Sequence, residues 1–470
     1  MSPSITIVGL GPGAADLLTL EAQRRLSASG EVYLRTQRHP TVAALPGNLR
    51  VHSFDHFYES LPTFEAVYEA IAAEVVRLGQ RPEGVTYAVP GHPLVGEATT
   101  QRILALAAEK GVAVEIVEGL SFIGPTLSAL GLDPLDGLQI VDALVVADQH
   151  HPHLSADRPA LLSQLYSRQV AGEVKLTLMN LYPDEHPVTL VRAAGSSDAA
   201  VHTLPLYELD RQPDLDHLTS LYVPPLEAPS SYETLQDVVA HLRAPDGCPW
   251  DREQTHESLR EGLLEETYEV LEAIDSGDMD KLCEELGDLL LQVGLQIQIA
   301  VEDGKFMPGD VIAGIVTKLW RRHPHVFGDL AVADVDEVLH NWEAIKQRER
   351  DERGEAGAKE VTSALNGVPR FLPALARAQA LIARAARFDY EETVALPSHV
   401  AQCLTRLEEA MSSRDAADRE EVLGETLLAL SHLSRRLEVD AESALRTAVA
   451  RFVARFARWE KTVEKESVTL

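Results

Sequence analysis

The sequence has few of the residues that build disulfide frameworks or zinc sites. Of its 470 residues only three are cysteines, Cys248, Cys283 and Cys403, and none of them forms a Cys-x-x-Cys pair. A disulfide scaffold and a zinc knuckle are therefore not indicated. This cysteine usage favours a reducing, cytoplasmic setting.

Positive charge and long hydrophobic runs are also scarce. The chain has 42 Lys and Arg against 73 Asp and Glu, a formal net charge of −31 at pH 7. This excess of acid disfavours nucleic acid and anionic membranes as general partners. No run of eighteen apolar residues occurs, and residues 5–8 follow a strand pattern rather than that of a signal peptide. The sequence predicts a soluble intracellular protein of about three domains.

Short β-branched runs alternate with helical stretches from residue 1 to about residue 225. Strand patterns at residues 5–9, 31–35, 85–89 and 112–117 are separated by helical patterns. This alternation predicts an α/β domain on a largely parallel sheet.

Three glycine-containing turns follow strands in this half of the chain, at residues 9–13, 90–94 and 119–121. At the carboxyl edge of such a sheet they would line a crevice of the kind that binds small ligands. The first turn is not the dinucleotide fingerprint, because Pro12 and Gly13 occupy its two variable positions. Tight turns without a ligand remain the alternative.

Together, the motifs GLGPG, VPGHPL and EGLS resemble the tetrapyrrole (corrin and porphyrin) methylase family. The resemblance covers residues 1–225 and implies two α/β subdomains that bind S-adenosylmethionine between them. Many active members have Gly-Asp-Pro where this chain has Gly-His-Pro, so the resemblance implies cofactor binding more directly than methyl transfer. The residues that it places at the cofactor cleft are Gly9, Gly11, Pro12, Gly13, Gly91, His92, Pro93 and Ser121.

A proline-rich stretch follows this half of the chain. Its composition is typical of an extended connection, and we expect a linker at residues 226–234. After it the strand pattern disappears and amphipathic helices take over, which places the domain boundary there.

Two acidic clusters flank a short polar break early in the helical half. The residues on both sides of the break have helical periodicity, which predicts an antiparallel helical hairpin. Glu266 and Asp288 each lie eleven residues from Gly277, and Glu269 and Glu285 each lie eight. Because both arms rise equally, these pairs should meet at the same heights, and the i, i+3 spacing keeps each cluster on one helix face.

Four carboxylates at a partly buried seam would repel one another, so the pattern predicts a bound cation. Oxygen ligands favour Mg²⁺ or Mn²⁺, ions that commonly accompany phosphate-bearing substrates. The predicted metal ligands are Glu266, Glu269, Glu285 and Asp288. The alternative is a solvated acidic face, which a single Glu-x-x-Glu would favour.

Basic residues gather on one helix downstream of the hairpin. Lys318, Arg321 and Arg322 are spaced i, i+3 and i+4, so they share one face of a helix that ends before Pro324. In a chain with little positive charge, this face is a candidate clamp for phosphate groups. Ion pairing with nearby acids is the alternative.

These helical segments resemble the MazG family of nucleoside triphosphate pyrophosphohydrolases. The motifs CPWD and RRHPHVF flank the acidic clusters in the family's order, and the order of the two halves resembles a known fusion. The resemblance implies an all-α, usually dimeric domain, here residues 235–355. The family's acidic signature falls on Glu265, Glu266, Glu269, Glu285 and Asp288.

The combined interpretation is Mg²⁺-dependent hydrolysis of a nucleoside triphosphate to a monophosphate and pyrophosphate. Glu265 or one of the four metal ligands would accept the proton of the attacking water. The basic face of Lys318, Arg321 and Arg322 would hold the phosphate tail.

A second copy of the hairpin is predicted within residues 362–465. A shift of 137 residues aligns the apolar framework, but the ligand positions now hold Arg406, Val422 and Glu425. Such a set cannot bind Mg²⁺ through side chains, so we expect a degenerate, metal-free MazG-like repeat. A chance alignment is the alternative.

Two other functions fit the same sequence. The first is an S-adenosylmethionine-dependent tetrapyrrole-type methyltransferase with a regulatory nucleotide-binding helical domain. The second is a sensor that binds nucleoside triphosphate without turnover.

Overall fold

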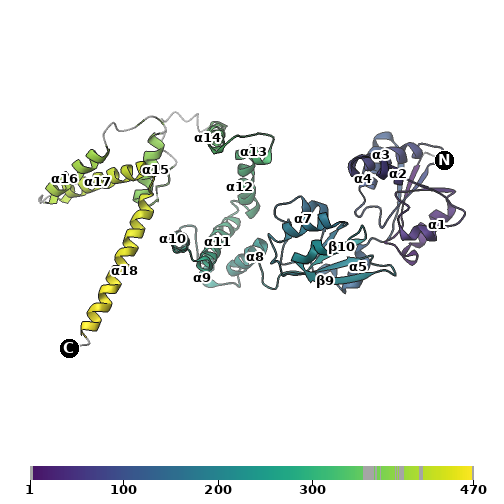
Figure 1. Ribbon diagram of the computed structural model, residues 1–470, viewed down its shortest axis with the longest axis horizontal. Helices are drawn as coiled ribbons and strands as arrows, with labels where there is room; N and C mark the ends of the chain where they lie inside the picture. The colour runs from purple at the N-terminus through teal and green to yellow at the C-terminus, as the bar shows by residue number, and fades with distance from the viewer. Residues whose placement is uncertain are drawn as a thin grey trace. The chain divides into compact units, whose positions relative to one another are not determined.

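The computed structural model describes residues 4–352, 365, 368–370, 372–386, 388, 390, 396–411 and 416–467. The chain forms two compact units, residues 1–313 and 314–470 (Figure 1). The boundary between them falls within the helix Pro308–Arg322. None of the described helices is both long and apolar enough to cross a bilayer.

A parallel sheet forms the first part of unit one. Its strand order is β3-β2-β4-β1-β5, and β1 pairs with β4 and β5 in parallel. Ile5 and Ile7 of β1 and Tyr87 of β4 are fully buried, as expected for a sheet packed on both faces. The strands are β1 (Ser4–Gly9), β2 (Glu31–Leu34), β3 (Arg50–Ser53), β4 (Val85–Val89) and β5 (Ala113–Val117).

The helices of this part connect its strands, and the last two, α5 and η3, follow β5 and lead to the second sheet. Thr63 caps α3 by accepting a hydrogen bond from the amide of Ala66, and Gly111 ends α4 at φ 65°. The helices are η1 (Ala15–Leu17), α1 (Leu20–Ala28), η2 (Pro40–Ala44), α2 (Asp55–Ser60), α3 (Phe64–Gly79), α4 (Ala98–Lys110), α5 (Ile123–Leu130) and η3 (Pro134–Asp136).

The second sheet is mixed, so the expected largely parallel arrangement holds only for the first sheet. Its order is β6-β7-β10-β8-β9, and only β6 and β7 pair in parallel. The short connection 193–199 joins β8 to β9 and allows antiparallel but not parallel pairing, and β10 pairs antiparallel with both β7 and β8. The elements are β6 (Gln139–Asp142), α6 (Ala143–Ala147), β7 (Ala160–Ser163), α7 (Arg168–Leu178), β8 (Pro187–Arg192), β9 (Ala200–Pro205), η4 (Leu206–Arg211) and β10 (Thr219–Val223).

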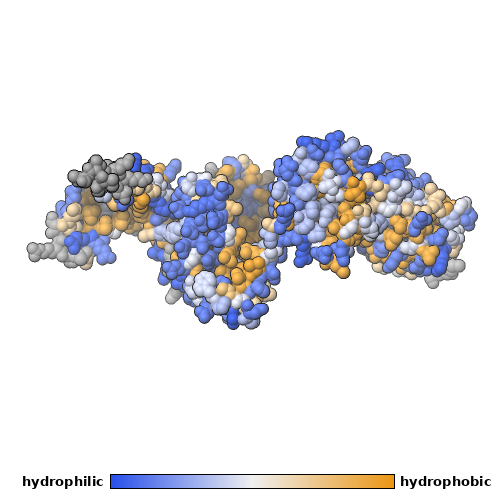
Figure 2. All heavy atoms as spheres, turned by 90° about the horizontal axis from the view of Figure 1, so that it is seen from below, coloured by the Kyte–Doolittle hydropathy of each residue, from blue (hydrophilic) through white to orange (hydrophobic). Residues whose placement is uncertain are grey.

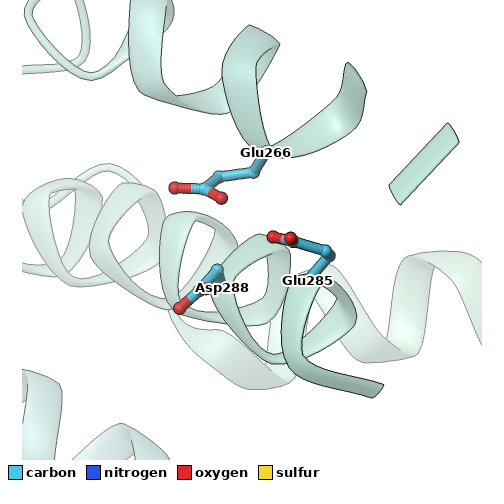
Figure 3. Close-up of side chains that lie close together, drawn as sticks. All are labelled: Glu266, Glu285 and Asp288. Carbon is cyan, nitrogen blue, oxygen red and sulfur yellow. The ribbon is translucent and has the colours of Figure 1, made fainter. Parts of the chain in front are cut away.

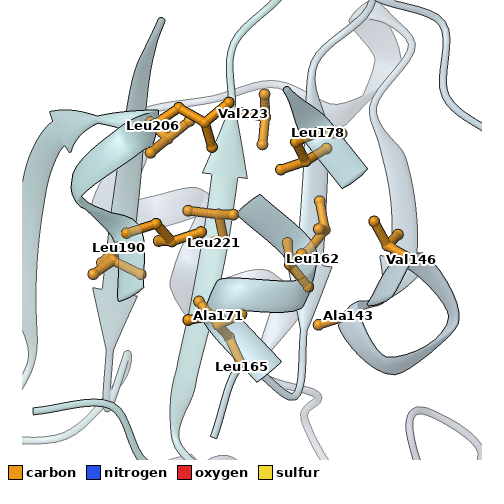
Figure 4. Packing of buried hydrophobic residues seen from close by; sticks show 14 of the residues in the cluster. Ala143, Val146, Leu162, Leu165, Ala171, Leu178, Leu190, Leu206, Leu221 and Val223 are labelled. Atoms are coloured by element: carbon orange, nitrogen blue, oxygen red, sulfur yellow. The ribbon is translucent and has the colours of Figure 1, made fainter. Parts of the chain in front are cut away.

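The core of the second sheet lies beneath α6 and α7. Leu162 of β7 and Leu221 of β10 are fully buried, and Leu178 of α7 packs with them in one cluster (Figure 4).

The predicted linker is held against this second part. The Leu226 amide donates to the Ala156 carbonyl at 2.8 Å, and its side chain packs against the core. Asp157 accepts hydrogen bonds from the amides of Ser230 and Ser231 at 2.7 and 3.1 Å, and from their hydroxyls and that of Thr234. Ser231 is the N-cap of the next helix, so Asp157 anchors the start of the helical half.

Asp157→Ala is expected to lower the free energy of unfolding by about 1–3 kcal/mol, because it leaves amide and hydroxyl donors unpaired. Hydrogen bonds from Ser231 and Thr234 hold the pKa of Asp157 below its ordinary value of 3.8. This contribution is therefore present above pH 3.8 and lost as the pH falls through the lower folded-state value. Urea denaturation tests the prediction, with Asp157→Asn, which keeps one acceptor oxygen, as the milder control. Equal midpoints for wild type and Asp157→Ala would contradict it.

Four helices complete the first unit. Val239 of α8 packs with Leu259, Leu295 and Ile299. Arg243 links the CPWD segment to α11. Its guanidinium pairs with Glu302 at 2.7 Å and donates hydrogen bonds to the carbonyls of Asp251 and Gln254. The helices are α8 (Tyr232–Arg243), α9 (Pro249–Arg252), α10 (Arg260–Ser276) and α11 (Met279–Glu302).

Among its described residues, the second unit contains helices and no strands. Helices α16 and α17 pack against each other, and α15 contacts α17 and α18. The predicted border between the two helical repeats, residues 355–362, lies outside the described residues. The helices are α12 (Pro308–Arg322), α13 (Pro324–Phe327), α14 (Val335–Glu352), α15 (Ala374–Ala386), α16 (Leu396–Met411), α17 (Ala416–Arg436) and α18 (Ala441–Ser467).

Candidate active site

The hairpin of α10 and α11 turns at the predicted place. Gly277 ends α10 at φ 71°, a left-handed conformation that glycine adopts without strain. Asp278 is the N-cap of α11, and its carboxylate accepts hydrogen bonds from the amides of Asp280 and Lys281. The two arms are therefore joined by a sharp turn and pack side by side.

Three of the four predicted metal ligands converge on this seam. Glu266 of α10 and Glu285 and Asp288 of α11 each offer a carboxylate oxygen, and these oxygens lie within 4.8 Å of one another (Figure 3). Glu269 is outside this group of three. Glu265 is exposed, because consecutive residues of a helix point in different directions and its neighbour Glu266 faces the seam.

The negatively charged carboxylates of this cluster repel one another, and this repulsion raises the pKa values of Glu266 and Glu285. Burial raises the pKa of Glu266 above its ordinary value, and Asp288, Glu269 and Glu285 raise it further. The pKa of Glu285 is raised by burial and then by Glu269. A group of oxygen donors that repel one another fits a hard divalent cation such as Mg²⁺.

Glu266→Gln is expected to raise the melting temperature in the presence of a chelator, because it removes one of the repelling charges. The pKa of Glu266 is raised in the folded state. Below pH 4.5, the ordinary pKa of a glutamate, this carboxyl group is protonated and its repulsion is absent. The repulsion, and the loss of stability that it causes, grow as the pH rises through the raised pKa. The variant should therefore exceed wild type at pH 8 and match it at pH 4 in thermal melts. Adding Mg²⁺ should stabilise wild type more than the variant. A variant that melts below wild type in chelator at pH 8 would contradict this.

The predicted basic face lies on α12, and two of its three residues are ion-paired. Arg321 and Arg322 each contact the carboxylate of Glu349 on α14 at 2.6 Å. Arg322 also lies over the ring of Trp342, 5.7 Å from its centroid. Lys318 has no ion pair with any described residue.

Glu349 was not identified from the sequence. Its carboxylate is buried, and hydrogen bonds from Arg322 lower its pKa, although burial opposes this. No local pattern links positions 322 and 349, because the pairing depends on how α14 folds back on α12.

In the N-terminal half, the three glycine turns pack on one another. The backbones of Gly11 and Gly91 exchange hydrogen bonds at 3.2 and 2.8 Å. A Cβ on Gly9 would lie 2.6 Å from the amide nitrogen of Gly119, so only glycine fits there. A Cβ on Gly11, where φ is 74°, would lie 2.8 Å from the Leu17 carbonyl, so substitution would disturb the fold itself.

A cavity of about 590 Å³ opens beside these turns. Of the predicted cleft residues, Pro12, Gly91, His92 and Ser121 line it. Gly9, Gly11, Gly13 and Pro93 do not line it. Part of the wall comes from the second sheet region, including Gln164 and Ala193, which adopt positive φ of 64° and 49°. Backbone strain at non-glycine residues beside a cavity is typical of functional sites.

Comparison with known proteins decides the family of the helical half. The family model for the MazG nucleotide pyrophosphohydrolase domain matches residues 254–327, which include the whole carboxylate cluster. A Thermotoga maritima protein named nucleoside triphosphate pyrophosphohydrolase/pyrophosphatase MazG is 41% identical over 246 residues, which are 52% of this chain and 91% of the relative. The chain belongs to the MazG family. The carboxylate cluster thus lies within its MazG domain.

Other relatives extend this result. The nucleoside triphosphate pyrophosphohydrolase of Escherichia coli K12 is 42% identical over 237 residues, which are 49% of this chain and 88% of the relative. A Bacillus subtilis protein named uncharacterized protein YabN is 40% identical over 479 residues, which cover 100% of this chain and 96% of the relative. Ahead of the MazG domain, the family model for tetrapyrrole (corrin/porphyrin) methylases matches residues 4–210. The predicted fusion of the two families is confirmed.

Proposed function

We propose that the chain is a Mg²⁺-dependent nucleoside triphosphate pyrophosphohydrolase that converts a nucleoside triphosphate and water to a monophosphate and pyrophosphate. The observation that carries this proposal is the convergence of Glu266, Glu285 and Asp288 within 4.8 Å, inside the region that the MazG model matches. The names of the Thermotoga and Escherichia relatives support the reaction.

The chemistry is divided among a small set of side chains. Glu266, Glu285 and Asp288 would hold Mg²⁺ or Mn²⁺, with Glu269 close enough to raise the pKa of the first two. A bound divalent cation lowers the pKa of a water and neutralises phosphate charge. The exposed carboxylate of Glu265, or one of the four other acids, would accept the proton of the attacking water.

The basic face on α12 would hold the phosphate tail. Lys318 is the strongest candidate for this role, because it has no ion pair with a described acid. Arg321 and Arg322 are fixed by Glu349, which limits the rotamer entropy that they would lose on contacting a phosphate.

The N-terminal domain would bind S-adenosylmethionine or its demethylated product in the cavity beside the glycine turns. Main-chain groups around Pro12 and Gly91 can hold an adenosyl ligand without side-chain charge. The alternative function, a tetrapyrrole-type methyltransferase regulated by its helical domain, rests on the same cavity and on the methylase match.

The helical domains would form a homodimer in the cytoplasm. Large apolar side chains are exposed along α10 and α11, including Leu264, Tyr268 and Leu290, and Figure 2 shows hydrophobic surface on the helical part of the chain. A second copy would cover such a face. The net charge of −31 argues against nucleic acid or a membrane as partner.

Residues 362–465 would be a degenerate MazG-like repeat that binds no metal. In its hairpin of α16 and α17, Arg406 donates to Glu425 at 2.5 Å. Both residues stand where the first hairpin has acids of the proposed site, so a guanidinium replaces the cation there. Val422, at a third such position, is buried.

Two assays on the full chain distinguish these functions. Pyrophosphate release from mixed nucleoside triphosphates should require Mg²⁺ and stop with a chelator. Methyl transfer from labelled S-adenosylmethionine, measured beside it, would support the methyltransferase. Triphosphate binding without either product would indicate a sensor and overturn the proposed hydrolase.

A further inference from the structure

The seam between α10 and α11 stays polar beyond the carboxylate cluster. Gln292 lies four residues after Asp288 on α11, and Gly262 lies four residues before Glu266 on α10. Residues four apart share a helix face, so both positions belong to the faces that carry the cluster. One helical turn rises about 5.4 Å, which sets the height of this next level of the seam above the cluster.

The side-chain amide of Gln292 packs against the backbone of Gly262. A Cβ on Gly262 would lie 3.0 Å from Nε2 and 3.7 Å from Oε1 of this amide. Even an alanine at this position would therefore press on the amide. The glycine leaves the space that the amide occupies at this level of the seam.

The Oε1 atom of Gln292 is buried and accepts no hydrogen bond from the described residues. Residues 254–327 are all described, and within them it is the one buried polar side-chain atom without a hydrogen-bond partner. Buried polar groups of native proteins are almost always paired. An unpaired acceptor beside the proposed site therefore points to a partner outside the chain.

The other two glutamines of α11 show how the chain satisfies such groups. The Oε1 atom of Gln296 meets Nδ1 of His256, and its Nε2 donates to the His256 carbonyl at 3.4 Å. The amide of Gln298 donates to Glu302 at 3.1 Å. Both amides are engaged with protein groups, so the unpaired state of Gln292 is not a general property of glutamines on this helix.

The chemistry of the unpaired atom selects the part of a nucleotide that can meet it. A carbonyl oxygen accepts hydrogen bonds and donates none, so phosphate oxygens, which are also acceptors, cannot pair with it. When the phosphates of a nucleoside triphosphate lie at a metal site, the ribose is the adjacent group that carries donors. Its hydroxyl groups suit an acceptor that lies one helical turn from the carboxylate cluster.

We propose that Gln292 recognises the sugar of the substrate by accepting a hydrogen bond from a ribose hydroxyl. The inference rests on the proposed hydrolysis of nucleoside triphosphates at the carboxylate cluster. A substrate without this hydroxyl leaves the buried acceptor unpaired, and a site built in this way discriminates against such a substrate. Gln292 thus sets the preference between ribonucleotides and their deoxy analogues.

Ribonucleoside triphosphates of the four common bases, compared with their 2′-deoxy and 3′-deoxy analogues, test this on the full chain with Mg²⁺. For a given base, one of the two analogues should have a kcat/KM for pyrophosphate release at least about tenfold below that of the ribonucleotide. The analogue that loses rate identifies the hydroxyl that Gln292 meets. Gln292→Met keeps the length of the side chain without the amide, so it should bring the three sugars within about twofold of one another. Gln298→Met, the matched control on the same helix, should keep the wild-type preference.

A binding measurement and a second variant make the test independent of turnover. Isothermal titration with α,β-methylene analogues, which resist cleavage between the α and β phosphates, should give the same order of sugars for wild type and no preference for Gln292→Met. Gly262→Ala should also weaken the preference, because its methyl group presses on the amide. Its melting temperature should not fall, since alanine favours a helix more than glycine does.

Four results would overturn the inference. Equal kcat/KM for all three sugars in wild type would show that no ribose hydroxyl meets Gln292, while leaving the hydrolysis itself intact. An equal loss for all sugars in Gln292→Met would mean that the amide acts on another group, such as a water on the metal. A preference that Gln292→Met retains would belong to another residue. Absence of pyrophosphate release from every triphosphate would overturn the proposed function as well.

Discussion

Asp288→Asn is expected to reduce the rate of pyrophosphate release at least about a hundredfold. An amide in place of this carboxylate removes one of the three converging oxygens that carry charge toward a divalent cation. Losing about 3 kcal/mol of transition-state stabilisation corresponds to more than about a hundredfold in rate. A coupled pyrophosphate assay under saturating triphosphate and Mg²⁺ measures the effect. The melting temperature of the variant in chelator should equal or exceed that of wild type, since repulsion is relieved.

Glu425→Gln is the matched control, because it makes the same kind of change at the aligned position of the second hairpin. Glu425 is paired with Arg406 and is half exposed, so its loss should leave pyrophosphate release within a few-fold of wild type. A loss as deep as that of Asp288→Asn would mean that the active repeat has been assigned wrongly. Full activity of Asp288→Asn would remove the carboxylate cluster from the reaction.

Lys318→Met is expected to lower kcat/KM about 10- to 100-fold with little change in melting temperature. A charge-assisted hydrogen bond to a phosphate is worth about 1.5–3 kcal/mol. Stability should be retained because Lys318 has no ion pair with the described residues. Steady-state kinetics and a thermal melt of the same sample test both parts.

Arg322→Met provides the contrast within the same helix. It leaves the buried carboxylate of Glu349 with Arg321 alone, so we expect a lower melting temperature as well as weaker activity. If Lys318→Met retained wild-type kcat/KM, Lys318 would have no part in holding the phosphate tail. If Arg322→Met melted like wild type, the pair with Glu349 would not support α12.

The hairpin could be predicted closely because its signal is local. The mirror-related distances of Glu266 and Asp288 from Gly277 follow from helix rise alone, and the structure places the turn at this glycine. The same arithmetic placed Glu269 opposite Glu285. Helix rise fixes height along the seam but not the direction of each side chain, which explains why Glu269 lies outside the group of three.

Features that depend on contacts between distant segments could not be predicted in this way. Arg35 and Gln164 line one cavity although they come from different sheets, and neither belongs to a motif. The mixed order of the second sheet, and the pairing of Arg322 with Glu349, likewise depend on tertiary packing. The glycine turns were visible in the sequence because their close backbone approach requires glycine at Gly9.

The central claim is tested most directly by identifying the phosphorus products of the full chain by ³¹P nuclear magnetic resonance. With a nucleoside triphosphate and Mg²⁺, the proposed reaction predicts a monophosphate and pyrophosphate in equal amounts. It predicts neither product when a chelator is present, and formation of both at least about a hundredfold more slowly in Asp288→Asn. Formation of a nucleoside diphosphate and orthophosphate, or pyrophosphate release at the wild-type rate in Asp288→Asn, would contradict it.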